Sequence, residues 1–391
     1  MENTANNSSV VIIGLGGAGG RVIQQMSLLP EAAGMKLCAF DTDRRALDML
    51  SALPEEARVL CDEQWLLGQG TGGDVIKGQR AMSRESSRLQ SIMHGAKLLL
   101  VLGGLGGGTA TGGAGVIARL ARTNNLTAVC LFELPFAFEG HGRIKTAEDG
   151  LRELLALSDT VLGIPNDLLF SVLPAETAFA DAFRMADMEL ARAALGVIDI
   201  LLPGNLLSSD MGDLISALKN RKSDAAVGVG CGNGANIGES CNQALNSLLD
   251  SPFLGGAAKL KEADAVLLNL TGGEELTLSE VKRTLESAGT LPGVSARVIA
   301  GANIRPGLGR TVRLTALAIK YDEQEAAKQQ LPARRKRSRS EQHKLPPVQQ
   351  TLPLTITSCG IFEGRTSTVI DGVNLDIPTF VRRQISIDTG E

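Results

Sequence analysis

The sequence predicts an α/β protein with a Rossmann-type parallel sheet, a long connecting helix and a second α/β region. Short apolar runs that end in glycine-rich loops are followed by helical patterns, and this strand, loop and helix unit occurs twice in the first half of the chain. With 391 residues, of which 43% are apolar, the chain is also long enough for more than one hydrophobic core.

The first half contains the apolar runs expected of a parallel, doubly wound sheet. Its strand candidates are 10–13, 37–40, 98–102, 128–131 and 161–164. Strands that alternate with helices in this way favour a parallel sheet, in a domain that we expect to span 10–174. From 175 to about 200, apolar residues recur at helical spacing without a proline. This predicts one long connecting helix, assigned to 175–203.

The next part of the chain continues as a second α/β region, which we expect to span 204–320. Its strand candidates are 225–229, 265–270, 297–300 and the alternating run 312–317.

Three further segments differ from these regions in composition. Residues 1–9 are polar and are predicted to be a disordered tail. Gln, Lys, Pro and Ser dominate 321–370, with five basic residues in the eight positions 333–340, which is typical of a disordered linker. Apolar residues return in 371–391, where a flexible chain gains little from them unless a partner buries them. We therefore expect a partner-binding peptide there.

Composition argues against several classes of protein. The formal net charge of −4 gives no overall basic field for nucleic-acid binding. The six cysteines have neither disulfide nor metal-ligand spacing, which favours a reducing cytoplasm and no metal site built from side chains. The N-terminus lacks a secretory layout. The uncharged run 98–118 is too rich in glycine for a membrane helix, so we expect no direct membrane insertion.

The first glycine loop, residues 14–20, lies between a strand and a helix. Backbone N–H groups at a helix start bind anions. The loop contains G-x-G-x-x-G at Gly14, Gly16 and Gly19, and Asp41 follows about twenty residues later. This pattern permits an NAD-dependent oxidoreductase.

The second glycine loop, residues 104–113, favours another ligand. It adds the hydroxyl groups of Thr109 and Thr111 ahead of a second helix. One pyrophosphate does not need two such loops, whereas a triphosphate with a metal ion does. The two loops together therefore favour a nucleoside triphosphate over NAD.

The second loop also carries a family resemblance. GGLGGGTATGG resembles the tubulin/FtsZ signature, usually GGGTGTG or GGGTGSG, with Ala110 in place of the middle glycine. VVIIGLGGAGGRVIQQM, AFDTDRRAL, ELPFAFEGHGR, LGIPNDLL and DAFRMADMEL occur in the order that this family uses, so the resemblance covers nearly the whole chain. It implies a tubulin-like fold that binds GTP or GDP with Mg²⁺.

The resemblance also implies roles for individual residues. Glu139, Arg143 and Asn166 would surround the ribose and the guanine, Phe183 would stack on the base, and Asp187 would read the guanine edge. A carboxylate suits guanine because it accepts from N1–H and from the amino group, whereas adenine presents a bare lone pair at N1. The other expected nucleotide-binding residues are Gly16, Gly17, Ala18, Gly19, Gly20, Arg21, Asp41, Gly70, Thr71, Gly72, Gly104, Gly106, Gly107, Gly108, Thr109, Ala110, Thr111, Gly112 and Pro135.

Residues 204–213 resemble the family's synergy loop, commonly GxxNxDxAD. In that family the loop of one subunit inserts into the nucleotide site of the next. The resemblance therefore implies that Asp210 and Asp213 are catalytic and polarise the attacking water, with Mg²⁺ on the triphosphate.

The chain departs from the family pattern at three places. Arg21 replaces the usual asparagine after the first loop, and LGQGTGGDV stands where LGAGANPEV is typical. The synergy loop has Ser208 for its asparagine and one extra residue after Gly204. Two interpretations of Arg21 stay open: it strengthens nucleotide binding beside the phosphates, or it points away from them.

Residues 371–383 resemble the family's C-terminal peptide, D-[IV]-P-x-[FY]-[LV]-R. In the family this peptide binds membrane tethers and division regulators, and Ile377, Phe380 and Val381 would be its apolar anchors. The residues expected to bind such partners are Asp376, Ile377, Pro378, Phe380, Val381 and Arg382.

The resemblance implies a cytoplasmic GTPase that polymerises head to tail, at the division site under the inner membrane. Its active site would be completed between adjacent subunits of the filament. The alternative is a GTP-binding filament scaffold with little hydrolysis, which the altered synergy loop permits.

Overall fold

The computed structural model describes residues 10–158, 160–171, 173–174, 176–201, 223–305, 307–321, 369–370 and 373–374. These residues belong to two compact units, divided after Pro332. In the second unit, β11 (Val369–Ile370) pairs antiparallel with β12 (Val373–Asn374). Everything below concerns the first unit.

The first sheet has six parallel strands in the order β3-β2-β1-β4-β5-β6. Their bounds are β1 (Val10–Leu15), β2 (Lys36–Asp41), β3 (Arg58–Leu60), β4 (Leu98–Gly104), β5 (Thr127–Leu134) and β6 (Thr160–Pro165). All five strands expected from the apolar runs are present. β3 was not predicted, because three residues are too few to show a strand pattern. The parallel sheet confirms the predicted fold class.

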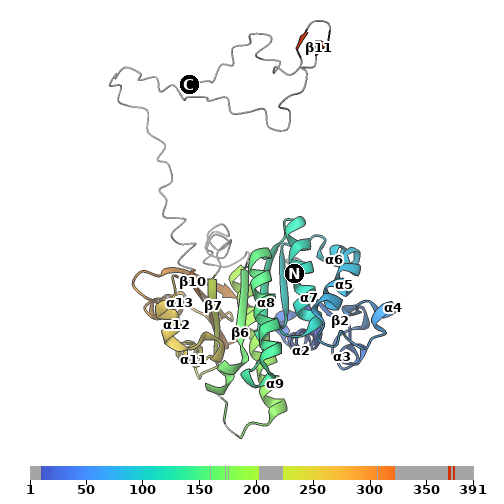
Figure 1. The fold of residues 1–391 in the computed structure, drawn as a ribbon. Helices are drawn as coiled ribbons and strands as arrows, with labels where there is room; N and C mark the ends of the chain where they lie inside the picture. The colour runs from blue at the N-terminus through green and yellow to red at the C-terminus, as the bar shows by residue number, and fades with distance from the viewer. Residues whose placement is uncertain are drawn as a thin grey trace. The chain divides into compact units, whose positions relative to one another are not determined.

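Helices cover both faces of this sheet (Figure 1). The α-helices are α2 (Gly16–Ser27), α3 (Arg44–Asp48), α4 (Glu63–Leu66), α5 (Val75–Arg84), α6 (Ser86–Met93), α7 (Gly108–Thr123) and α8 (His141–Leu157). Short 3₁₀ turns are η1 (Pro30–Ala32), η2 (Glu55–Ala57), η3 (Ala137–Glu139) and η4 (Asn166–Ser171). Ile12 of β1 enters the core under α2, and its neighbour Ile13 enters the core under α5 to α8. The sheet is therefore buried on both faces.

Close packing explains why position 19 of the first loop is a glycine. A Cβ atom on Gly19 would lie 2.6 Å from the carbonyl oxygen of Leu102 in β4. The start of α2 therefore approaches the sheet backbone more closely than any other residue would allow.

The long helix α9 (Phe179–Leu201) follows the first sheet. It begins at Phe179 and not at residue 175 as predicted, because the chain first makes a turn in which the N–H of Thr177 donates to the carbonyl of Pro174. The helix packs against α2 and β5 and also against the second sheet. None of the helices in the described part of the chain is long and apolar enough to cross a membrane.

The second sheet has four strands in the order β7-β10-β8-β9. The strands are β7 (Ser223–Gly232), β8 (Ala265–Gly272), β9 (Arg297–Ile304) and β10 (Val312–Tyr321). β10 runs antiparallel to β7 and β8, whereas β8 and β9 are parallel. The helices α11 (Ile237–Leu249), α12 (Gly256–Glu262) and α13 (Leu278–Gly289) and the turn η5 (Pro252–Leu254) accompany this sheet. The expected second α/β region is present, with its own core.

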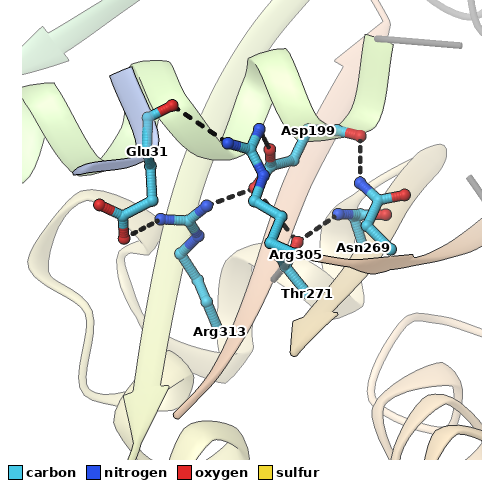
Figure 2. Close-up of polar contacts among 7 residues, drawn as sticks. Glu31, Asp199, Asn269, Thr271, Arg305 and Arg313 are labelled. Atoms are coloured by element: carbon cyan, nitrogen blue, oxygen red, sulfur yellow. Dashed lines mark hydrogen bonds and ion pairs between the residues drawn. The ribbon is translucent and has the colours of Figure 1, made fainter. Parts of the chain in front are cut away.

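A buried carboxylate joins α9 to the second sheet (Figure 2). Asp199 forms ion pairs with Arg305 and with Arg313 of β10. Its Oδ2 also accepts from the Thr271 hydroxyl of β8 at 3.1 Å. Both arginines reach Glu31 as well: Arg305 Nη1 donates to its carbonyl at 3.0 Å, and Arg313 Nη1 lies 3.3 Å from its carboxylate. The charges of two acids and two arginines balance within this cluster.

We predict that Asp199→Asn lowers the free energy of unfolding by about 3 kcal/mol, because it leaves two largely buried guanidinium groups with only Glu31 as a counterion. Urea unfolding followed by circular dichroism measures this loss. The matched control is Asp149→Asn, which breaks the exposed pair with Arg152 and should cost about 0.5 kcal/mol. Equal losses in the two variants would contradict the structural role of Asp199.

Candidate functional site

A cavity of about 820 Å³ lies at the carboxyl ends of β1, β2, β4 and β5. Strand order reverses between β1 and β4, since the chain first adds β2 and β3 on one side and then β4 on the other. Open parallel sheets bind ligands at such a reversal point. The fold therefore places a ligand cavity where the sequence has its two glycine loops.

Two helix N-termini meet at one end of this cavity. Gly16, Gly17 and Ala18 of α2 line it, as do Gly107, Gly108 and Thr109 at the start of α7. The first N–H groups of a helix lack partners within the helix, and the helix dipole adds positive potential there. This end of the cavity is suited to an anion such as a phosphate chain.

Local hydrogen bonds shape the second loop. Gly106 has φ of +99°, a conformation that favours glycine, and its N–H donates to the Thr111 hydroxyl at 2.9 Å. Thr111 thus holds the loop and does not line the cavity.

Asp41 and Thr109 supply oxygen atoms beside the glycine loops. Asp41 accepts from the N–H of Thr42 at 2.7 Å, and the hydroxyls of Thr42 and Thr109 lie 2.7 Å apart. Burial raises the pKa of Asp41, and the two N–H donors from Thr42 and Asp43 oppose that shift. The glycine-rich segment LGQGTGGDV, residues 67–75, contacts the chain next to Asp41. The N–H of its Gly70 donates to the Thr42 carbonyl at 3.0 Å.

Charged side chains gather at the other end of the cavity. Arg21 of α2 forms a bidentate ion pair with Asp187 of α9, with Nε–Oδ2 and Nη2–Oδ1 distances of 2.7 and 3.2 Å. Asp187 is only 2% exposed, whereas the side chain of Arg21 is 44% exposed. Arg21 therefore pairs with Asp187, and its Nη1 atom would also lie 3.8 Å from a Cβ atom placed on Gly17, so the guanidinium group stays close to the first glycine loop.

Glu133 and Asn166 lie beside this ion pair. Both are buried and line the cavity, and among the residues that the structure describes the Glu133 Oε1 and Asn166 Oδ1 atoms have no hydrogen-bond partner. Burial first, and then the charge of Asp187, raises the pKa of Glu133 to about 8, although Arg21 and a hydrogen bond from Asn166 lower it. Near neutral pH this end thus carries one ionised and one protonated carboxyl group.

Phenylalanine rings form one wall of the cavity. Phe179 and Phe183 both line it, and their ring centroids lie 4.9 Å apart in an edge-to-face arrangement. Phe183 also contacts Phe136 at 5.3 Å. Phe179 is 67% exposed, so a flat ring in the cavity could stack on a surface that is already in place.

Glu139 and Arg143 lie on the rim of the cavity. Glu139 accepts from the Phe136 N–H at 2.8 Å, and its other oxygen pairs with Arg143 Nε at 3.1 Å. The carboxylate thereby fixes the turn η3 and orients the arginine.

The structure brings most of the expected nucleotide-binding residues around this cavity. Those that line it are Gly16, Gly17, Ala18, Arg21, Asp41, Gly104, Gly107, Gly108, Thr109, Ala110, Pro135, Glu139, Arg143, Asn166, Phe183 and Asp187. Those that do not are Gly19, Gly20, Gly70, Thr71, Gly72, Gly106, Thr111 and Gly112. Whether the lining residues bind nucleotide stays a prediction.

Two sets of predicted residues lie outside the part of the chain that the structure describes. These are the catalytic candidates Asp210 and Asp213, and the peptide residues Asp376, Ile377, Pro378, Phe380, Val381 and Arg382.

The sequence analysis missed several residues of the cavity. They are Leu15, Gln24, Gln25, Leu105, Glu133, Leu134, Phe179, Ala180 and Arg184. A signal existed for Glu133, since it is a carboxylate at the end of an apolar strand run, at the edge where a parallel sheet binds its ligand.

Taken together, the sheet and its two glycine loops define a nucleotide-binding α/β protein. Residues 9–174 match the model of the Tubulin/FtsZ family, GTPase domain, and 223–322 match that of the FtsZ family, C-terminal domain. The cell division protein FtsZ of Rickettsia felis is 31% identical over 328 residues, which is 82% of this chain and 69% of the relative. The Rickettsia typhi protein of the same name is 30% identical, over 84% and 71%.

Solved structures show the same relationship. The empty FtsZ dimer of M. jannaschii has a TM-score of 0.68 and 25% identity, over 87% of this chain and 95% of that one. GDP-bound CetZ1 of Haloferax volcanii, at 22% identity over 79% and 93% of the two chains, has a TM-score of 0.64 and shares the fold. The chain belongs to the FtsZ family and carries its GTPase domain. This membership argues against the NAD-dependent oxidoreductase.

We predict that Glu133→Gln makes the protein less sensitive to alkaline pH. The folded protein holds the Glu133 proton up to about pH 8, whereas an ordinary glutamate loses its proton near pH 4.5, so wild-type stability falls as pH rises between these values. Glutamine has no proton to lose, and the variant should be more stable than wild type by roughly 2 kcal/mol at pH 8.

The measurement is urea unfolding at pH 5, 6, 7 and 8. Glu133→Asp is the matched control, because it changes the packing yet keeps a titrating carboxyl group. A stability difference between Glu133→Gln and wild type that is the same at every pH would show that Glu133 does not titrate in this way.

Proposed function

We propose that the protein binds GTP in this cavity, hydrolyses it and polymerises head to tail into filaments of the bacterial division ring. The observation that carries this proposal is the polarity of the cavity, which has helix N-termini at one end and carboxyl groups at the other. The relatives named as cell division proteins support the same cellular role.

The residues at the end of the cavity that contains the carboxyl groups of Glu133 and Asp187 fit guanine. Asp187 supplies the carboxylate that can accept from N1–H and from the amino group. The unpaired acceptor Asn166 Oδ1 is buried at the same end, where a donor on the base would satisfy it, and the unpaired Oε1 of the protonated Glu133 can donate to an acceptor on the base. Adenine lacks a proton at N1, so it could not donate to the Asp187 carboxylate from that position.

The residues at the end of the cavity formed by the N-termini of α2 and α7 fit the triphosphate and Mg²⁺. Backbone N–H groups of α2 and α7 would hold the phosphates, and the oxygen atoms of Asp41 and Thr109 are the hard ligands that Mg²⁺ prefers. When bound, the ion would neutralise the charge that develops on the phosphates.

Catalysis would need a second subunit. Asp210 and Asp213 follow the end of α9 at Leu201, in the segment that resembles the synergy loop. We infer that they polarise the attacking water in the nucleotide site of the next subunit. A related CetZ2 from Haloferax volcanii is described as a GTPγS-bound protofilament, which supports assembly of this kind.

The rest of the chain fits a cytoplasmic filament attached to the division site under the inner membrane. We propose a GTP-binding domain (10–174), a connecting segment (175–203) that contains the helix α9 from Phe179 to Leu201, and a C-terminal domain (204–320). A tail (1–9) would precede them and a linker (321–370) would follow, although the structure places Tyr321 in β10 and Val369–Ile370 in β11 and so corrects the prediction that all of 321–370 is disordered. The peptide 371–391 would bind membrane tethers and division regulators through the apolar side chains of Ile377, Phe380 and Val381.

If the active site is completed between subunits, GTP hydrolysis per subunit should rise with protein concentration and level off as polymer forms. Phosphate release and light scattering, measured across a dilution series, test this, with electron microscopy of samples containing GTP, GDP or no nucleotide. We expect Asp213→Ala to reduce hydrolysis roughly 100-fold. Asp250→Ala, an exposed residue after α11 in the same domain, is the control and should leave hydrolysis unchanged.

Hydrolysis that does not depend on concentration, without polymer, would contradict this mechanism. GTP-dependent filaments with near-background phosphate release in both wild type and Asp213→Ala would instead favour the scaffold that binds GTP with little hydrolysis.

We predict that Asp187→Asn weakens GTP binding by about 10- to 100-fold and favours XTP, as measured by titration calorimetry. The asparagine amide accepts from N1–H of xanthine and donates to its 2-oxo group, whereas the same amide N–H faces a donor in guanine. Asp181→Asn is the matched control on the same helix, at an exposed position paired with Arg184. Unchanged preference for GTP in Asp187→Asn would place the base elsewhere.

A further inference from the structure

Arg21 and Asp187 form a contact that links two helices far apart in the sequence. They lie on α2 and α9, are 166 positions apart, and both line the base end of the cavity. Each carboxylate oxygen accepts one hydrogen bond from the guanidinium group, at 2.7 and 3.2 Å. Because a carboxylate oxygen can accept two hydrogen bonds, each oxygen of Asp187 keeps one lone pair free.

We propose that Arg21 is the positioning residue of the base site: it keeps the Asp187 carboxylate ionised and turned so that its free lone pairs accept from both donors of guanine. This inference rests on the proposed function, because it assumes that guanine occupies this end of the cavity. It adds a role for a residue where the chain departs from the family pattern.

The charges around Asp187 explain why such a residue is needed. Asp187 is buried, and its neighbour Glu133 is a second carboxyl group on β5. Glu139 and Arg143 on the rim pair with each other. Arg21 is thus the cation that contacts Asp187, and without it burial would favour the protonated acid.

Protonation would change what Asp187 can recognise. An ionised carboxylate accepts from N1–H and from the amino group at the same time, whereas a protonated one turns one oxygen into a donor. That donor would face the guanine amino group, which is itself a donor. Arg21 therefore affects base selectivity without needing to touch the base.

The exposure of Arg21 separates this role from a role in folding. Its side chain is 44% exposed and its loss opens no cavity in the core, so the fold should tolerate a substitution. Nucleotide binding, in contrast, should change with pH.

The test compares wild type, Arg21→Gln and Arg21→Lys by titration calorimetry with GDP and with IDP, which lacks the 2-amino group, between pH 5.5 and 7.5. We expect the acid-side loss of GDP affinity to begin about one pH unit higher in Arg21→Gln than in wild type, because the cation that favours the carboxylate is gone. At pH 6 its GDP affinity should be weaker by up to about tenfold, with the preference for GDP over IDP reduced toward one.

Arg21→Lys keeps the charge but loses the bidentate contact, so its pH profile should resemble that of wild type although its affinity is lower. The same series in a Glu133→Gln background removes the other titrating carboxyl group, and the shift caused by Arg21→Gln should persist there. Urea unfolding of each variant checks that the fold is intact.

Two results would overturn the inference while leaving GTP binding in place. One is an Arg21→Gln profile identical to wild type. The other is a loss of affinity that is equal at every pH, with an unchanged preference for GDP over IDP. Failure of wild type to bind any guanine nucleotide would instead overturn the proposed function, and the inference with it.

Discussion

The ion pairs of Asp199 hold the end of α9 against the second sheet, and α9 is the helix that contacts both sheets. Asp199 is fully buried and joins the end of α9 to β10 through Arg313. The same helix carries Asp187, twelve positions earlier and so about 18 Å along the axis, at the base end of the nucleotide cavity. The same helix therefore contacts the second sheet at one end and lines the cavity at the other.

Backbone groups line one end of the cavity, and charged side chains line the other. At the phosphate end, glycines and helix N-termini offer N–H groups that do not titrate. At the other end lie three titratable side chains, Arg21, Glu133 and Asp187. The pKa of each carboxyl group there depends on the charges of its neighbours. Under the proposed function, the end with the helix N-termini would hold the phosphates of any nucleotide, so selectivity would come from the other end. That end is also the place where this chain has an arginine instead of the usual asparagine.

The features that could be predicted from the sequence are those that depend on neighbouring residues. Continuous apolar runs predicted five strands of the parallel sheet, and the glycine loops predicted where its cavity lies. β3 is too short to give a pattern, and the start of α9 depends on a turn at Pro174. The pairing of Arg21 with Asp187 spans 166 positions, so no local pattern could indicate it. The position of Glu133 at the end of an apolar run is visible in the sequence, but its raised pKa is not, because the burial that causes it depends on residues far away in the chain.

The balance of charge at the base end has a consequence for the ligand. With Arg21 and Asp187 ionised and Glu133 protonated, this end carries no net charge near neutral pH. A neutral guanine ring can enter such a site without bringing a charge out of water. An ionised base would bring an uncompensated charge next to a buried carboxylate, and the desolvation that raises the Glu133 pKa would also disfavour that base. Under the proposed function, electroneutrality would therefore favour a neutral base over an ionised one, the hydrogen bonds would select guanine among the neutral bases, and Arg21 would supply the balancing positive charge.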